Sequence, residues 1–243
     1  MTRKAIEVKE LNFSYPDGRK ALVDINLDVY EGEALGVIGP NGAGKSTFLL
    51  HLNGILRGNS KIKILGIEME NKSLPQIRSR AGLLFQDSEN QLFMPTVFED
   101  VAFGPLNMDL SKDEVEVVVK EALKEVDMLD YIYHHPHHLS FGEKRRIALA
   151  TVLAMKPKIL LLDEPTSNVD PKHRRDLINF LKELDNLTKV IATHDLELVF
   201  EVCSRVALLD QGRLITSGNP LEILKDKTLL AAHSLEVPRW LSS

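Results

Sequence analysis

The opening of the chain alternates apolar and polar residues, whereas later segments contain short, unbroken apolar runs. Residues 6–13 and 22–29 alternate, which predicts two half-buried strands, and Pro-Asp-Gly at 16–18 predicts a turn between them. Residues 34–38 and 81–85 are apolar runs with the length of buried strands, and residues 158–163 contain another such run. Residues 188–192 are also expected to form a strand. The sequence therefore predicts an α/β fold that opens with an antiparallel, β-rich unit.

Between these runs, apolar residues recur with helical spacing. The expected helices are residues 48–52, 74–80, 96–107, 111–127, 143–155, 171–184, 196–202 and 221–232, with short hairpins at 61–69 and 205–216. The helices expected at 96–107 and 111–127 fall between two core strands, so we expect a helical subdomain inserted into the core. The expected organisation is one domain, residues 1–243, with an α/β core at 1–87 and 156–225, a helical subdomain at about 88–155, and a C-terminal tail at 226–243 that contains Trp240.

Composition narrows the class of protein. The 243 residues are 44% hydrophobic, which is ordinary for one large α/β domain. No apolar run approaches the roughly 20 residues that cross a bilayer, and the N-terminal residues lack the apolar core of a signal peptide, so we expect a location in the cytoplasm. Cys203 is the only cysteine, which excludes an internal disulfide and favours a buried, inert thiol. The net charge of −5 argues against general nucleic-acid binding.

The strongest motif follows the apolar run at 34–38 and has the spacing G-x-x-x-x-G-K-S of a phosphate-binding loop. Its residues are Gly39, Pro40, Asn41, Gly42, Ala43, Gly44, Lys45, Ser46 and Thr47. The glycines let the backbone fold around an anion and aim its N–H groups inward, and the following helix adds the positive end of its dipole. Lys45 would reach the β- and γ-phosphates of ATP, and the Ser46 hydroxyl would help to hold Mg²⁺.

A second motif places two carboxylates, Asp163 and Glu164, at the end of the apolar run 158–163. Successive strand residues point in opposite directions, so one carboxylate can serve a metal while the other faces a reacting phosphate. We expect Asp163 to coordinate Mg²⁺ and Glu164 to orient or deprotonate the attacking water. Two uncompensated carboxylates would be costly in a purely structural role.

Three further polar residues follow strands or turns, and each has two interpretations. Tyr15 either packs in its turn or offers a flat aromatic platform to a nucleotide base. Gln86 follows a buried strand, where it either faces the Mg²⁺ or the attacking water or is an ordinary loop amide. His194 either hydrogen-bonds a γ-phosphate or water, or caps the helix expected at 196–202.

The segment Leu-Ser-Phe-Gly-Glu at 139–143 precedes a helical run, so Ser140 and the backbone of Gly142 would form an anion site at a helix N-terminus. The basic residues at 144–146 are interpreted as a solvated turn or as partners of nearby acids. A histidine-rich loop at 134–138 suggests metal binding, but Pro136 interrupts it and no carboxylate or cysteine ligand pattern accompanies it, which disfavours that role.

These elements, in this order, resemble the ATP-binding-cassette (ABC) ATPases over residues 6–224. The resemblance rests on Tyr15, the phosphate loop, Gln86, the signature at 139–143, Asp163 with Glu164, the loop at 167–170, and His194. It implies a P-loop NTPase core of ABC type, with an antiparallel β subdomain and an inserted α-helical subdomain. It also implies ATP and Mg²⁺ as ligands, with Ser46, Gln86 and Asp163 at the metal and Glu164, His194 and Gln86 in catalysis.

The family further implies a second ABC ATPase subunit. Two cassettes pair head to tail around two ATP molecules, so Ser140 and Gly142 of one would touch the γ-phosphate held by the other. Asp170 belongs to a loop that communicates across that interface. Two departures stand out: Phe141 replaces the usual glycine of the signature, and Asn168-Val169 replaces the usual Ala-Leu. The bulk of Phe141 predicts a looser or differently packed closed interface.

A narrower resemblance, over residues 13–18, 85–93 and 91–105, is to the ATPases of energy-coupling-factor importers, and most to the cobalt/nickel type. It implies a transmembrane coupling protein and a substrate-binding membrane protein as partners, and a peripheral location at the cytoplasmic face of the cell membrane. Residues 91–105 then either line the groove for the coupling protein or pack inside the helical subdomain.

The alternatives are vitamin uptake by the same kind of importer, a different importer or an exporter, and a soluble ABC ATPase acting on nucleic acid or ribosomes. The last usually carries two cassettes or a long coiled coil. This chain has one phosphate loop, one signature and no heptad run, and it is acidic. We therefore expect no nucleic-acid partner. The pattern leaves both homodimer and heterodimer open.

Overall fold

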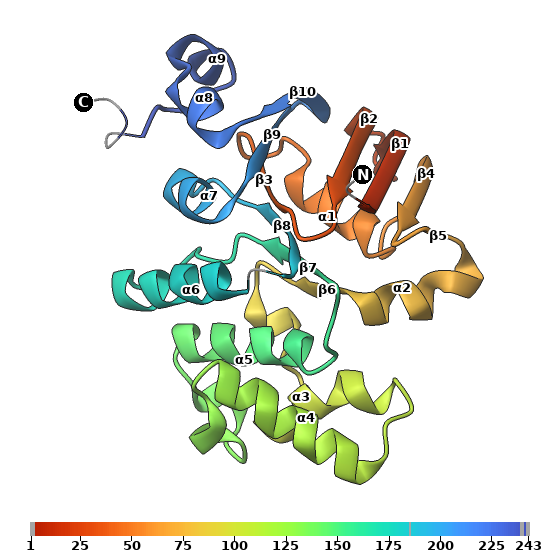
Figure 1. The fold of residues 1–243 in the computed structure, drawn as a ribbon, viewed down its shortest axis with the longest axis vertical. Coiled ribbons are helices and arrows are strands. Elements are labelled where there is room, and N and C mark those ends of the chain that lie inside the picture. Colours follow the sequence, from red (N-terminus) through yellow and green to blue (C-terminus); the bar gives the residue numbers. More distant parts are fainter. Residues whose placement is uncertain (1–2, 185, 239–240, 242–243) are drawn as a thin grey trace.

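The computed structural model describes residues 3–184, 186–238 and 241, and it contains two sheets (Figure 1). The smaller sheet is antiparallel, with the order β2-β1-β4-β5. Its strands are β1 (Lys4–Ser14), β2 (Lys20–Tyr30), β4 (Asn59–Ile64) and β5 (Ile67–Glu68). The predicted antiparallel opening and the hairpin at 61–69 are confirmed.

The larger sheet has the order β10-β9-β3-β8-β7-β6. Its strands are β3 (Ala34–Ile38), β6 (Ala81–Leu84), β7 (Ile159–Asp163), β8 (Thr188–Ala192), β9 (Arg205–Asp210) and β10 (Arg213–Gly218). Only the edge strand β10 runs antiparallel to its neighbour. Every residue of β3, β6, β7 and β8 is buried, as expected for parallel strands covered on both faces. The parallel order brings the carboxyl ends of β3, β7, β8 and β6 to one edge.

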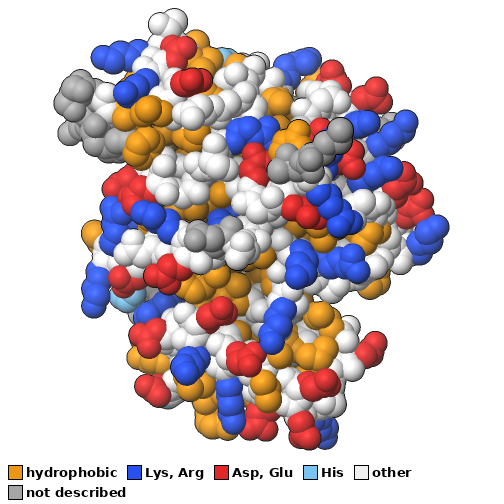
Figure 2. All heavy atoms as spheres, in the orientation of Figure 1, with side chains coloured by type: hydrophobic (Ala, Val, Ile, Leu, Met, Phe, Trp, Pro, Cys, Tyr) orange, Lys and Arg blue, Asp and Glu red, His pale blue; other side chains and the backbone are white. Residues whose placement is uncertain are grey.

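Helices cover this sheet and form one end of the molecule. Their bounds are α1 (Lys45–Leu52), α2 (Leu74–Arg80), α3 (Val97–Leu106), α4 (Lys112–Glu125), α5 (Phe141–Leu153), α6 (Pro171–Glu183), α7 (Leu196–Val202), α8 (Pro220–Lys225) and α9 (Lys227–Ala232). Helices α3, α4 and α5 lie between β6 and β7 in the chain and gather at the end of the molecule opposite α8 and α9 (Figure 1). Acidic and basic side chains are interspersed over the face seen in Figure 2, the part formed by these helices included.

The helix starts follow the capping signals of the sequence. The side chains of Thr96, Ser111 and Ser140 each accept from the backbone N–H of the glutamate three residues later. The side chain of that glutamate accepts from the backbone N–H of the capping residue, which completes a capping box. Asp170 and Asp195 cap α6 and α7 by accepting backbone N–H bonds with their carboxylates, without a capping box. These caps fix the residues at which the five helices begin.

One predicted helix, at 221–232, is wrong as a single element. Asp226 has extended backbone angles (φ −75°, ψ 91°), and its carboxylate accepts from Leu229 N at 2.9 Å, so it ends α8 and caps α9. Trp240, in the expected C-terminal tail, lies outside the described residues. Cys203 is buried, and burial raises the pKa of its thiol to about 12, which confirms the inert thiol. Among the residues that the structure describes, no helix is both long and apolar enough to span a bilayer.

Candidate functional site

The phosphate loop joins β3 to α1 and turns back on itself through glycines with positive φ. Gly44 has φ 102°, and a Cβ there would lie 2.5 Å from the Ala21 carbonyl oxygen. Gly39 is tighter still, with a Cβ position 2.0 Å from the Leu209 carbonyl oxygen. Glycine at these positions is therefore a steric requirement, and it lets the loop approach both β2 and β9.

Lys45 lies inside this loop. Its Nζ donates to the carbonyl oxygens of Gly39 at 2.8 Å and Pro40 at 3.2 Å. Burial lowers the pKa of Lys45, and the nearby carboxylates of Glu164 and Asp163 oppose that shift. An ammonium buried beside two carboxylates is a strong partner for the phosphate groups of a nucleotide, because little water screens the interaction.

A hydrogen bond connects the phosphate loop to the carboxylate strand. The Ser46 hydroxyl donates to Asp163 Oδ1 at 2.9 Å, and Asp163 is buried, which raises the pKa of its carboxyl group. The two side chains supply oxygen ligands from α1 and from the end of β7 to one point. Such a sparse oxygen set fits Mg²⁺, which takes one or two protein carboxylates and completes its shell with water and substrate phosphates.

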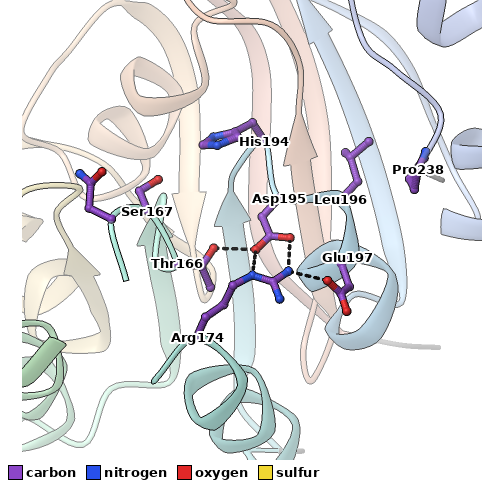
Figure 3. A pocket seen from close by; sticks show the side chains of 9 residues that line it. Thr166, Ser167, Arg174, His194, Asp195, Leu196, Glu197 and Pro238 are labelled. Carbon is purple, nitrogen blue, oxygen red and sulfur yellow. Dashed lines mark hydrogen bonds and ion pairs between the residues drawn. The ribbon is translucent and has the colours of Figure 1, made fainter. Parts of the chain in front are cut away.

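A cavity of about 450 Å³ opens over the loop and collects most of the predicted residues. Its lining includes Tyr15, Asn41, Gly42, Ala43, Gly44, Lys45, Ser46, Thr47, Gln86, Glu164 and His194, together with Arg19, Lys20, Ser167 and Asn168. A hollow of about 520 Å³ adjoins it and shares Ser167, Asn168 and His194 (Figure 3). The sequence reasoning did not single out Arg19 and Lys20, which follow the turn after Tyr15.

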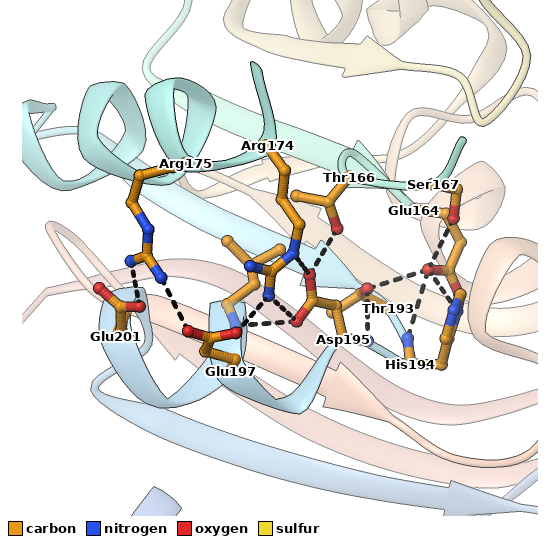
Figure 4. A network of polar contacts seen from close by, with 11 residues as sticks. Glu164, Thr166, Ser167, Arg174, Arg175, Thr193, His194, Asp195, Glu197 and Glu201 are labelled. Atoms are coloured by element: carbon orange, nitrogen blue, oxygen red, sulfur yellow. Dashed lines mark hydrogen bonds and ion pairs between the residues drawn. The ribbon is translucent and has the colours of Figure 1, made fainter. Parts of the chain in front are cut away.

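Glu164 is held in an unusual conformation at the end of β7 (Figure 4). Its φ is +44°, and its N–H donates to the Ala192 carbonyl oxygen at 2.8 Å. Its Oε2 accepts from Thr193 Oγ1 at 2.9 Å and from His194 N at 3.3 Å, and it lies 2.9 Å from His194 Nδ1. A left-handed backbone at a non-glycine residue is strained, and the surrounding bonds maintain it. The carboxylate is thereby aimed at the cavity and at His194, a geometry suited to a base that handles one water.

Tyr15 packs locally, as one of its two interpretations predicts, and it also lines the cavity. Its hydroxyl lies 2.9 Å from Thr47 Oγ1, and Phe13 packs edge-on against its ring at 5.1 Å, so the ring is fixed by local packing. It also lines the cavity, where the Arg19 guanidinium lies 4.9 Å from the ring centroid. The ring is thus a rigid wall of the site, close to the end of the phosphate loop.

Ser140, Gly142 and Asp170 lie outside this cavity and form a second group. Ser140 begins α5, with its Oγ donating to Glu143 Oε2 at 2.7 Å. Asp170 begins α6 and accepts from the backbone and ring of His173. A Cβ on Gly142 would lie 3.4 Å from His173 Cγ, so His173 packs between the signature and the loop of Asp170. The chain brings these three residues together, but not to the phosphate loop.

The prediction of a solvated basic turn at 144–146 is wrong for Arg145. Its side chain is 2% exposed and donates to carbonyl oxygens at the ends of two neighbouring strands. Those oxygens belong to Phe85, Gln86, Asp163, Glu164 and Pro165. Burial lowers the pKa of Arg145 to about 10. Lys144 instead pairs with a nearby acid, as the alternative interpretation predicts: its Nζ lies 2.7 Å from Glu89 Oε1.

The contacts at the start of α7 exclude one interpretation of His194. His194 does not cap α7, because Asp195 occupies that position and accepts from Leu198 N at 3.1 Å. In the histidine-rich loop, His135 accepts from His137 N at 3.3 Å, and their rings lie 5.1 Å apart. The described part of the chain contains no group of three or more His, Cys, Asp or Glu side chains arranged to hold a metal ion.

Comparisons with known proteins agree with this geometry. Residues 22–167 match the family model of the ABC transporter. The energy-coupling factor transporter ATP-binding protein EcfA of Methanothermobacter thermautotrophicus is 48% identical over 96% of this chain and 77% of its own. The structure of cbiO1 from Clostridium perfringens, described as part of the ABC transporter complex cbiONQ, has a TM-score of 0.83 and 38% identity, covering 99% of this chain and 98% of that one.

A third neighbour is the ATP-binding cassette MJ0796, solved as a dimer in a post-hydrolysis state with ADP and Pi. It has a TM-score of 0.81 and 28% identity, covering 88% of this chain and 98% of that one. The chain therefore belongs to the ABC transporter family. Its two sheets and inserted helices are those of the ATP-hydrolysing cassette of that family, which confirms the predicted fold class.

Proposed function

We propose that this chain is the ATP-binding and ATP-hydrolysing subunit of a membrane importer of the energy-coupling-factor type. The observation that carries the proposal is the convergence on one cavity of Lys45, Ser46 and the Glu164–His194 pair. Ser46 in turn donates a hydrogen bond to the Asp163 carboxylate. The 48% identity to an energy-coupling factor transporter ATP-binding protein supports the type of transporter.

In this proposal the loop N–H groups and Lys45 bind the β- and γ-phosphates of ATP. Ser46, Asp163 and Gln86 would hold Mg²⁺, which neutralises phosphate charge when bound. Glu164 orients the attacking water and accepts its proton. His194, hydrogen-bonded to Glu164, faces the same cavity and donates to the γ-phosphate. Tyr15 stacks on the base.

The second group completes the site from another subunit. Ser140, Gly142 and Asp170 stand apart from this chain's own phosphate loop, so they serve an ATP held by a partner cassette in a head-to-tail pair. The dimeric state of the neighbour MJ0796, with ADP and Pi, supports such a pairing. A second copy of this chain and a different ABC ATPase both fit this description.

An exposed apolar patch supports a membrane partner. We define the patch as Phe93, Phe103 and Leu106, which are 60%, 46% and 54% exposed, and the rings of Phe93 and Phe103 pack edge-to-face at 5.2 Å. In the same segment Leu92 and Val97 are buried core residues, so residues 91–105 divide between packing and surface. Exposed aromatic side chains of this kind suit an interface. The patch would receive a transmembrane coupling protein that carries a substrate-binding membrane protein, which places the chain peripherally at the cytoplasmic face.

The helical segment, residues 88–155, would act as a subdomain on the α/β core formed by 1–87 and 156–225, followed by the tail at 226–243. For the substrate we propose cobalt or nickel ions, supported by the likeness to cbiO1 at 38% identity. Uptake of a vitamin is the alternative. The mixed charge of the face in Figure 2 and the net charge of −5 favour a protein partner over nucleic acid.

Substituting a residue of the exposed patch tests whether the patch binds the proposed membrane partner. The chain is co-expressed with a candidate transmembrane coupling protein, and the retention of the chain on washed membranes is measured. Phe103→Ser is expected to reduce retention about tenfold, because a buried aromatic anchor contributes on the order of 1–2 kcal/mol to an interface. Ile215→Ser is the matched control, since Ile215 is 38% exposed on β10, at the other end of the molecule. Equal retention of both variants would contradict the proposed patch.

A further inference from the structure

A continuous set of hydrogen bonds leads from Glu164 to helix α6 (Figure 4). Thr193 Oγ1 donates to Glu164 Oε2 at 2.9 Å, and it accepts from Asp195 N at 3.0 Å. The Asp195 carboxylate in turn accepts from Arg174 Nε at 2.8 Å and from Nη2 at 2.7 Å. The Glu164 carboxylate, at the end of β7, is thus connected through the turn after β8 to Arg174 on α6.

Asp195 is fixed from several directions. Besides Arg174, it accepts from Thr166 Oγ1 at 2.8 Å and from Leu198 N at 3.1 Å. Burial opposes ionisation of Asp195, but the bonds from Arg174, Leu198 and Thr166 prevail and hold the pKa of its carboxyl below its usual range. The two-point contact with the planar guanidinium fixes orientation as well as distance. The turn at 193–195 is therefore positioned by α6 as well as by β8.

We propose that Arg174 and Asp195 are positioning residues for ATP hydrolysis. They hold the turn that carries Thr193 and His194 so that both side chains reach Glu164. The arginine and aspartate act through that turn and take no part in proton transfer. Small displacements of a catalytic group lower a rate strongly, because the reaction depends on near-attack geometry. This inference rests on the proposed role of Glu164.

The neighbouring Arg175 offers a matched comparison on the same helix. Arg175 Nη2 donates to Glu197 Oε1 at 2.7 Å, and Nη1 donates to Glu201. Arg174 also reaches Glu197, at 2.9 Å. Both arginines therefore connect α6 to α7, but among their described contacts only those of Arg174 include Asp195 (Figure 4). A purely structural role of the ion pairs predicts the same consequence for losing either one.

The test compares Arg174→Gln with Arg175→Gln in the full chain, measuring kcat, the Kd for ATP and the Tm. We expect Arg174→Gln to lower kcat about tenfold with a Kd within about twofold, since the phosphate loop is untouched. Arg175→Gln should keep the wild-type kcat with a similar Tm. Arg174→Lys should recover only part of the loss, because lysine lacks the planar fork. Equal kcat values for the two glutamine variants would overturn the proposal.

A double-mutant cycle separates this proposal from the one on which it rests. If Arg174 acts through Glu164, adding Arg174→Gln to Glu164→Gln should not lower the residual single-turnover rate further. A further tenfold fall would overturn the inference while leaving Glu164 in its role. Normal hydrolysis by Glu164→Gln alone would instead refute that role. Asp195→Asn gives a second route if Arg174→Gln does not fold, because asparagine still caps α7.

Discussion

The two groups of candidate residues differ in how completely one chain surrounds them. Lys45 and Glu164 are 7% and 6% exposed, and strand ends, loop carbonyls and hydroxyl groups hold them in place. Ser140 and Asp170 are exposed at the outer ends of α5 and α6, and their capping bonds are all within their own helix starts. We call the first group the phosphate-loop side and the second the signature side. All contacts that hold the phosphate-loop side come from one chain, whereas the signature side exposes the N-termini of α5 and α6.

This difference has a physical basis. A site that must stabilise buried charge needs fixed partners, because an unpaired charge in a low-dielectric interior is expensive. A surface that must bind and release another subunit's phosphate gains from exposed helix N-termini, whose N–H groups offer a partial positive charge without prior desolvation. Variants on the two sides should therefore separate hydrolysis from subunit pairing.

The largest effect is expected from Glu164→Gln on the phosphate-loop side. Glutamine can keep the bond from Thr193 but cannot accept a proton, so hydrolysis should fall at least ~10²-fold while ATP still binds. Single-turnover hydrolysis and the mass in solution, with and without ATP and Mg²⁺, measure both properties. We expect an ATP-dependent dimer.

Two results would contradict parts of this expectation. Near-normal turnover would remove Glu164 from its role as base. A chain that binds ATP but stays monomeric would point to a different ATPase partner, or to closure that requires the membrane subunit, and would reject pairing of this chain with itself in solution.

An intermediate effect is expected on the signature side, from Gly142→Ala. The added Cβ would lie 3.4 Å from His173 Cγ, an ordinary contact, so the subunit should fold and bind ATP normally. In the proposed head-to-tail pair Gly142 contacts the partner's γ-phosphate, so we expect the added methyl group to weaken ATP-dependent dimerisation about tenfold, equivalent to roughly 1.4 kcal/mol. The dimer Kd is measured in the Glu164→Gln background.

Gly218→Ala on β10 is the control, because its added Cβ would also make only an ordinary contact, 3.7 Å from Ile223. Unchanged dimerisation of Gly142→Ala would show that Gly142 does not face the partner nucleotide. Loss of ATP binding by the monomer would contradict the separation of the two sides.

The same division explains what the sequence could predict. The phosphate loop and the two carboxylates at the end of β7 were predictable, because each depends on local spacing next to an apolar run of strand length. Likewise, the capping residue Ser140 could be identified from neighbours within four positions. The residues within a few positions of each other are enough to predict these features. The parallel sheet then brings the phosphate loop and the carboxylates to the same edge, because both follow the carboxyl ends of parallel strands.

The contacts of Arg145 and Arg174 were beyond such reasoning. Arg145 is buried because β6 and β7 are neighbours in the sheet, which brings the Gln86 and Glu164 carbonyls to one guanidinium across about sixty and twenty residues of sequence. No local pattern distinguishes that arginine from the partly buried basic residues on either side of it. The sequence did contain a signal for the break at Asp226, because aspartate is a common helix cap and here accepts from Leu229 N. The apolar residues on both sides keep helical spacing, however, and that spacing predicted one continuous helix.

The smallest effect is expected at Tyr15, where the two interpretations of the ring can be separated. Tyr15→Ala removes a wall of the cavity and should weaken ATP binding ~3–10-fold, as expected for one aromatic contact of about 0.5–1.5 kcal/mol. Tyr15→Phe loses only the contact with Thr47 and should stay within about twofold of wild type. Inorganic tripolyphosphate is the discriminating ligand, because it has no base. If the ring stacks on the base, Tyr15→Ala weakens ATP and leaves tripolyphosphate unchanged; an equal loss for both ligands means that the ring serves the phosphate loop through packing alone.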